Sequence, residues 1–127
     1  MRKIYLESPF AGNIKRNITY ARRAMRDSTL RNESAIASHL LWTQPGILDD
    51  LNPTERAQGI EAGFQWAQHA DASVFYTDYG ISPGMELGIQ RAQQEGRTIE
   101  YRSIGKNPQT RLQSILAQAI DIFKATV

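Results

Sequence analysis

Short apolar runs alternate with longer amphipathic segments along the chain. Runs rich in β-branched and aromatic residues, each closed by turn-forming residues, predict strands at residues 3–7, 35–41, 72–77 and 98–102. Apolar residues at helical spacing predict helices at residues 13–31, 52–69 and 82–96, and a last helix from residue 107. Because strand and helix alternate four times, we expect an α/β fold. Its core would be a doubly wound parallel sheet of four or five strands with helices on both faces, in one domain spanning residues 1–127.

The helix starts carry their own markers. Asn52 can cap a helix, Pro53 suits the first helical position, and Glu55 stands where a capping-box carboxylate belongs. Ser82 followed by Pro83 marks the next start in the same way. For the first helix the spacing predicts one inward stripe, consisting of Ile14, Ile18, Ala21 and Met25.

Composition narrows the classes of protein that fit. The chain has 127 residues, 41% of them hydrophobic, and no cysteine, which excludes disulfides and thiolate chemistry. No apolar run approaches the ~20 residues of a membrane span, so we expect no membrane partner. The first residues lead straight into a strand pattern, so we expect no signal peptide and a cytoplasmic location.

Charge is distributed unevenly along the chain. Residues 1–32 hold eight Lys or Arg against two Asp or Glu, whereas residues 33–80 hold one against seven. A basic segment can attract nucleic acid. Here the basic residues fall on one predicted helix without interleaved aromatic residues, so a solvated helix face is the favoured interpretation and nucleic-acid binding is not expected.

The chemistry is expected where the first and third strands run into helices. Ligands of open parallel sheets bind beyond the carboxyl ends of the strands, and free N–H groups at helix starts bind polar groups. Neither segment matches a phosphate loop or a dinucleotide fingerprint, so we expect no nucleotide cofactor. The candidate ligand-binding residues of the two segments are Ser8, Pro9, Phe10, Gly12, Asn13, Ser82 and Gly84.

Other candidates have both a structural and a functional interpretation. Glu86, in the first turn of a helix, either complements the helix dipole or acts as a nucleophile or acid–base group in a cleft. Tyr5 lies on a strand and favours a core position, and His39 beside Trp42 favours packing, although both can face a ligand. No second ligand stands near His39 at metal-binding spacing, so we expect no metal site.

The chain contains three further motifs: Tyr5-Leu6 followed by Ser8-Pro9-Phe10, then Ala70-Asp71-Ala72 after Trp66, and Gly84-Met85-Glu86-Leu87-Gly88. Together they resemble the nucleoside 2-deoxyribosyltransferase superfamily, which includes the 2'-deoxynucleoside 5'-monophosphate N-glycosidases. The segment of residues 38–46 resembles uncharacterised bacteriophage proteins related to that superfamily, and a phage protein would work in the cytoplasm of its bacterial host.

The resemblance implies cleavage of an N-glycosidic bond in a nucleoside or nucleotide by a homodimer or larger oligomer. Glu86 would attack the anomeric carbon, Tyr5 would help to place that carboxylate, and Ser82 would bind a 5'-phosphate or hydroxyl. Capture by a carboxylate splits one difficult step into two easier ones.

The sequence departs from the superfamily at two positions. Relatives carry an acidic residue where this chain has Gly63 or Gly80, so the general acid must come from elsewhere, with Asp78 as the first candidate and Asp49 or Asp50 as alternatives. Two functions therefore stay open. One is an N-glycosidase or deoxyribosyltransferase, and the other is a non-catalytic phage protein that holds a nucleotide signal in the same pocket.

Overall fold

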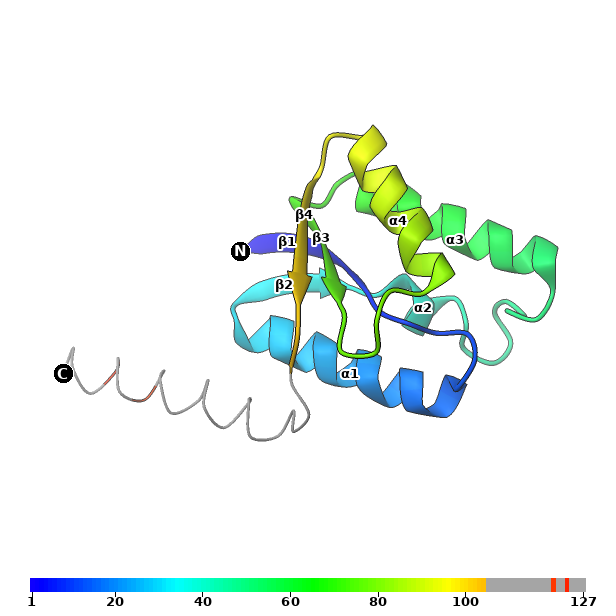
Figure 1. Ribbon diagram of the computed structural model, residues 1–127, viewed down its shortest axis with the longest axis horizontal. Coiled ribbons are helices and arrows are strands. Elements are labelled where there is room, and N and C mark those ends of the chain that lie inside the picture. Colours follow the sequence, from blue (N-terminus) through cyan, green and yellow to red (C-terminus); the bar gives the residue numbers. More distant parts are fainter. Residues whose placement is uncertain (105–119, 121–122, 124–127) are drawn as a thin grey trace.

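Four parallel strands form one sheet in the part of the chain that the structure describes (Figure 1). The structure is a computed structural model that describes residues 1–104, 120 and 123. The strands lie in the order β2-β1-β3-β4, and their bounds are β1 Arg2–Glu7, β2 Glu33–Ile36, β3 Ala72–Tyr76 and β4 Thr98–Arg102. The predicted α/β fold with a parallel sheet is confirmed, whereas the predicted helix from residue 107 lies largely outside the described residues.

The strand order reverses direction beside β1. The chain moves from β1 outward to β2 and then crosses back over β1 to β3, so the loops after β1 and β3 diverge at one point of the sheet edge. Such a switch point opens a crevice for ligands.

The connecting helices are α1 Ile14–Leu30, α2 Ser38–Leu41, α3 Pro53–Ala67 and α4 Pro83–Gln94.

Helices cover both faces of the sheet, as Figure 1 shows with α1 on one side and α3 and α4 on the other. Side chains of β1 alternate between the faces. Ile4 and Leu6 pack in one core cluster with Tyr20 of α1, whereas Tyr5 packs with Phe64 of α3. The odd-numbered side chains of β1 therefore face α3 and α4.

Side-chain caps fix where the helices begin. The Asn52 side chain accepts hydrogen bonds from the backbone N–H groups of Thr54 and Glu55 at 3.0 and 3.2 Å, as its predicted capping role requires. The Ser82 hydroxyl accepts one from the N–H of Met85 at 3.3 Å and starts α4. The capping-box role predicted for Glu55 is wrong, because its carboxylate instead accepts a bond from the N–H of Asp49.

The second strand is shorter than predicted. It ends at Ile36, the last residue paired with β1, and the chain then turns into the single-turn helix α2. His39 therefore lies on a helix rather than at a strand end. This turn moves Ser38 and His39 over the end of β1, where both side chains bond to residues of the first strand and its loop.

The predicted inward stripe of α1 is also wrong in part. Ile14 is 37% exposed, whereas Asn17 and Asp27 are fully buried. Asn17 donates hydrogen bonds to the carbonyls of Phe10 and Ala11, which anchors the loop after β1. Polar residues thus share the buried face because they have partners there.

None of the helices among the described residues is long and apolar enough to span a membrane.

Candidate functional site

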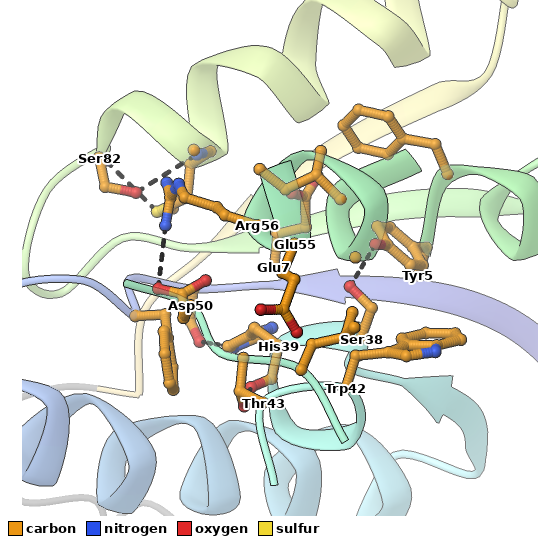
Figure 2. Close-up of a pocket in the computed structure, with 18 residues that line it drawn as sticks. Tyr5, Glu7, Ser38, His39, Trp42, Thr43, Asp50, Glu55, Arg56 and Ser82 are labelled. Atoms are coloured by element: carbon orange, nitrogen blue, oxygen red, sulfur yellow. Dashed lines mark hydrogen bonds and ion pairs between the residues drawn. The ribbon is translucent and has the colours of Figure 1, made fainter. Parts of the chain in front are cut away.

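A pocket opens at the switch point between β1 and β3. It contains about 690 Å³ of empty space, a figure that includes open solvent at its mouth. Its walls come from the end of β1, helix α2, the loop into α3, α3 itself and the start of α4. The lining residues labelled in Figure 2 are Tyr5, Glu7, Ser38, His39, Trp42, Thr43, Asp50, Glu55, Arg56 and Ser82.

Tyr5 lines the pocket next to α2. Its hydroxyl lies 2.5 Å from the Ser38 hydroxyl, and its ring meets the edge of Phe64 at a centroid distance of 6.4 Å. Burial raises the pKa of Tyr5 well above its usual value, so the phenol is neutral. A neutral phenol hydrogen-bonded to Ser38 can orient a polar group but cannot supply charge.

His39 is held by the loop that follows β1. Its Nε2 lies 2.7 Å from the Ser8 hydroxyl, and the Phe10 ring meets its edge at 6.5 Å. Burial lowers the pKa of His39 to about 4, so the imidazole is neutral near pH 7. His39 can therefore accept or donate a hydrogen bond in the pocket but does not carry a positive charge there.

Glu7 is the carboxyl group at the centre of the site. In Figure 2 it is drawn between Tyr5 on one side and the Asp50–Arg56 pair on the other. Its Oε2 is out of contact with solvent and is one of two such buried side-chain oxygens among the described residues that have no hydrogen-bond partner, the other being Oδ1 of Asp27. Burial raises the pKa of Glu7 to about 8, against the lowering effect of the Arg97 charge. Glu7 is therefore mostly protonated at neutral pH.

Gly88 provides the space for this carboxyl group. A Cβ atom at position 88 would overlap the Glu7 carboxyl carbon and both of its oxygens. Helix α4 therefore lies close to the end of β1 only because residue 88 has no side chain. The glycine of the Glu-Leu-Gly motif thus accommodates an acid that comes from a different element.

A second acidic group stands on the opposite wall. Asp50, in the loop before α3, forms an ion pair with Arg56 at 3.1 Å, and the side chains are 19% and 33% exposed. Glu55 lines the same wall. The site therefore combines a protonated carboxyl group, an ion-paired carboxylate and a guanidinium within one pocket.

Apolar residues complete the walls and favour binding of a flat ring. Trp42, Phe10 and Phe64 line the pocket together with aliphatic side chains. Aromatic walls with a few polar groups are typical of sites that bind small aromatic ligands.

No three His, Cys, Asp or Glu side chains within the described part of the chain come together as a metal site.

The structure brings most of the predicted site residues together. Those that line the pocket are Tyr5, Ser8, Phe10, His39, Trp42, Ser82 and Gly84. Those that do not line it are Pro9, Gly12, Asn13, Asp78 and Glu86. Asn13 instead caps α1, where its side chain accepts a bond from the N–H of Arg16.

The two predicted acidic groups lie elsewhere for different reasons. Glu86 is exposed on α4, because the helix turns the neighbouring Met85 inward to the pocket. Asp78 accepts hydrogen bonds from the Tyr20 hydroxyl at 2.5 Å, from the N–H of Ile104 at 3.0 Å and from the Ser103 hydroxyl. Asp78 therefore links α1 to the segment after β4, and it does not line the pocket.

Gly63 and Gly80, where the resemblance leads us to expect acidic residues, each have a structural reason to be glycine. A Cβ at Gly63 would fall within 2.6 Å of the Ser38 hydroxyl and even closer to the Tyr5 hydroxyl, so α3 packs directly on that pair. Gly80 has a positive φ of 80° in the turn after β3, a conformation that favours glycine. Neither position can take an acidic side chain in this arrangement without a change in the backbone or in its neighbours.

Glu7 was not predicted as a site residue, although strand alternation could have identified it. Residues 5 and 7 of a strand face the same side, so a pocket that contains Tyr5 also receives Glu7. Ser38, Thr43, Arg56 and Met85 were not singled out either, because their place depends on how α2, α3 and α4 pack.

Comparisons with known proteins agree with this architecture. Residues 2–102 match the sequence profile of a family described as Domain of unknown function (DUF7768). The fold is similar to that of a 2-deoxyribosyltransferase from the psychrotolerant bacterium Bacillus psychrosaccharolyticus, with a TM-score of 0.56 and 18% identity over 83% of this chain and 74% of that one. A comparison with curated proteins gives no significant match.

Proposed function

The chain belongs to the family described as Domain of unknown function (DUF7768), and from its fold and pocket we propose that it cleaves the N-glycosidic bond of a nucleoside or nucleotide. The observation that carries the proposal is a pocket at the β1/β3 switch point in which two acidic groups have different environments. Glu7 is half-buried and its Oε2 is buried without a hydrogen-bond partner, whereas Asp50 is paired with Arg56. The similar fold of a 2-deoxyribosyltransferase supports this reaction class.

Glycosidic cleavage requires groups of this kind. The bond breaks with positive charge developing on the sugar, and nearby carboxylates stabilise that charge. The departing base leaves more easily when an acid protonates it. A pair of carboxyl groups whose environments hold one protonated and the other ionised can divide these tasks. We assign stabilisation of the sugar cation to Asp50 together with Glu55.

The remaining lining residues fit the other parts of a nucleoside. Phe10, Trp42 and Phe64 offer apolar surface to the base. The hydroxyls of Ser8 and Ser82 can hydrogen-bond to a sugar hydroxyl, and Arg56 with Ser82 suits a 5'-phosphate. Tyr5, fixed by Ser38, orients the sugar from below.

Glu86 does not carry this proposal, because it is exposed and does not line the pocket. We expect Glu86→Gln to retain base release. Loss of base release in Glu86→Gln with the fold intact would return the role of nucleophile to Glu86. The homodimer or larger oligomer implied by the resemblance stays a prediction, which light scattering tests.

The proposal is tested by incubating the protein with the four common 2'-deoxynucleosides and their 5'-monophosphates. Free base is measured by reversed-phase chromatography. We expect time-dependent release of base from at least one of these compounds, in proportion to protein concentration. Absence of release from every compound, with and without a second free base as acceptor, would refute cleavage.

A second function is favoured by the position of Glu86. The resemblance assigns Glu86 as the nucleophile, but Glu86 does not line the pocket. The pocket can therefore hold a nucleotide without cleaving it. Binding alone predicts thermal stabilisation by a nucleotide with no free base. Ligand at 100-fold its dissociation constant would add about 2.7 kcal/mol to the free energy of unfolding.

A further inference from the structure

We propose that Glu7 is the acid that protonates the departing base, an inference that rests on the proposed function and identifies its missing proton donor. Glu7 stands near the end of β1, and its carboxyl group lines the pocket.

The position of Glu7 suits proton donation. The carboxyl group lines the pocket, and its Oε2 is buried without a hydrogen-bond partner. Buried polar atoms are nearly always paired, and the exceptions often have a functional cause. Because Oε2 is out of contact with solvent and lies against Gly88 of α4, donation to a ligand in the pocket falls to the other carboxyl oxygen, Oε1.

The packing around Glu7 holds it in this place. Gly88 leaves room for the carboxyl group against α4. Tyr5, two residues before Glu7 and on the same face of β1, is hydrogen-bonded to Ser38. Arg97, whose charge lowers the pKa of Glu7, donates to the Ser73 hydroxyl at 2.8 Å and pairs with Glu95 at 3.0 Å. The environment therefore stabilises the neutral acid, whose pKa is raised to about 8.

The reaction balances with Glu7 and water as the only further participants. The Glu7 proton passes to the base while the electron pair of the C1'–N bond stays on the base nitrogen. Water then attacks C1' of the sugar cation and gives its proton to the Glu7 carboxylate. The products are the free base and the free sugar, and Glu7 is again protonated.

The experiment compares wild type with Glu7→Gln and Glu7→Asp on the 2'-deoxynucleoside or monophosphate that the panel cleaves fastest. Rates are measured across pH, and thermal midpoints are measured for every variant. We expect Glu7→Gln to lower kcat at least about 100-fold with little change in KM. Wild type should lose activity as the pH rises through about 8, and Glu7→Asp should keep such an alkaline limb at a lower rate.

The outcomes separate the two proposals. A wild type that releases no base from any compound overturns the proposed function, and this inference with it. An active wild type whose Glu7→Gln variant stays within a few fold of it, or keeps the same alkaline limb, overturns the role of Glu7 alone. A purely structural role would lower the thermal midpoint and leave the alkaline limb in place, so Glu7→Asp decides the question if Glu7→Gln does not fold.

Discussion

Replacing Glu7 with Gln should remove a pH dependence of folding stability that the buried acid creates. The carboxyl group has a pKa of about 8 in the folded protein and an ordinary value of 4.5. The folded state therefore holds the proton more tightly than the unfolded state. This contribution to stability is fully present below about pH 4.5 and is lost as the pH rises through about 8.

The magnitude follows from the difference in pKa. Between the two pKa values the free energy of unfolding should fall by about 1.4 kcal/mol per pH unit, and by roughly 5 kcal/mol in total. That is a large share of the about 5–15 kcal/mol that stabilises an ordinary domain. Glu7→Gln carries a neutral side chain of similar shape and should lack this slope.

Urea unfolding of wild type and Glu7→Gln at matched ionic strength, in steps from about pH 5 to about pH 8, measures the effect. The difference between the two proteins isolates Glu7, because His39 and the other groups titrate in both. We expect Glu7→Gln to become progressively more stable than wild type as the pH rises. A difference that stays constant over this range would refute the assignment of a buried, protonated Glu7.

Three further predictions follow from other contacts. His39, whose pKa is lowered to about 4 from 6.5, contributes stability that is present above pH 6.5 and lost as the pH falls towards 4, so His39→Asn should flatten that acid limb in urea unfolding. Gly63→Ala should cost about 1–3 kcal/mol because its Cβ meets Ser38, whereas Gly84→Ala, with its nearest contact at 3.6 Å, should cost nothing; equal thermal midpoints for the two variants would contradict this. Asn52→Ala should lose about 1 kcal/mol of helix capping and Asn52→Ser should recover most of it, which chemical denaturation can check.

Periodicity predicted the order of the elements well because it depends on local sequence. The bounds of β4 agree with the prediction, and α3 begins at Pro53 behind its Asn52 cap as expected. The face of α1 was harder to predict, because Asn17 and Asp27 are buried through partners that lie far along the chain. Asp27, for example, accepts a hydrogen bond from the Tyr76 hydroxyl at 2.7 Å.

The location of the site was predictable, but its acidic groups were not. Ligands of open parallel sheets bind beyond the carboxyl ends of the strands, which predicts a site at the loops after β1 and β3. Both loops contribute residues to the pocket. Whether Glu86 reaches the pocket depends on how α4 sits against the sheet and the neighbouring loops, which a helical pattern alone does not fix. The wall formed by Asp50 and Arg56 depends on how the loop before α3 folds back.

The most direct test of the account is base release by wild type measured beside Glu7→Gln. Both proteins are incubated at neutral pH with the panel of 2'-deoxynucleosides and their 5'-monophosphates, and free base is separated by chromatography. The account predicts a base peak that grows with time for wild type and is reduced at least about 100-fold for Glu7→Gln. No base peak from wild type, or peaks of equal size from the two proteins, would contradict it.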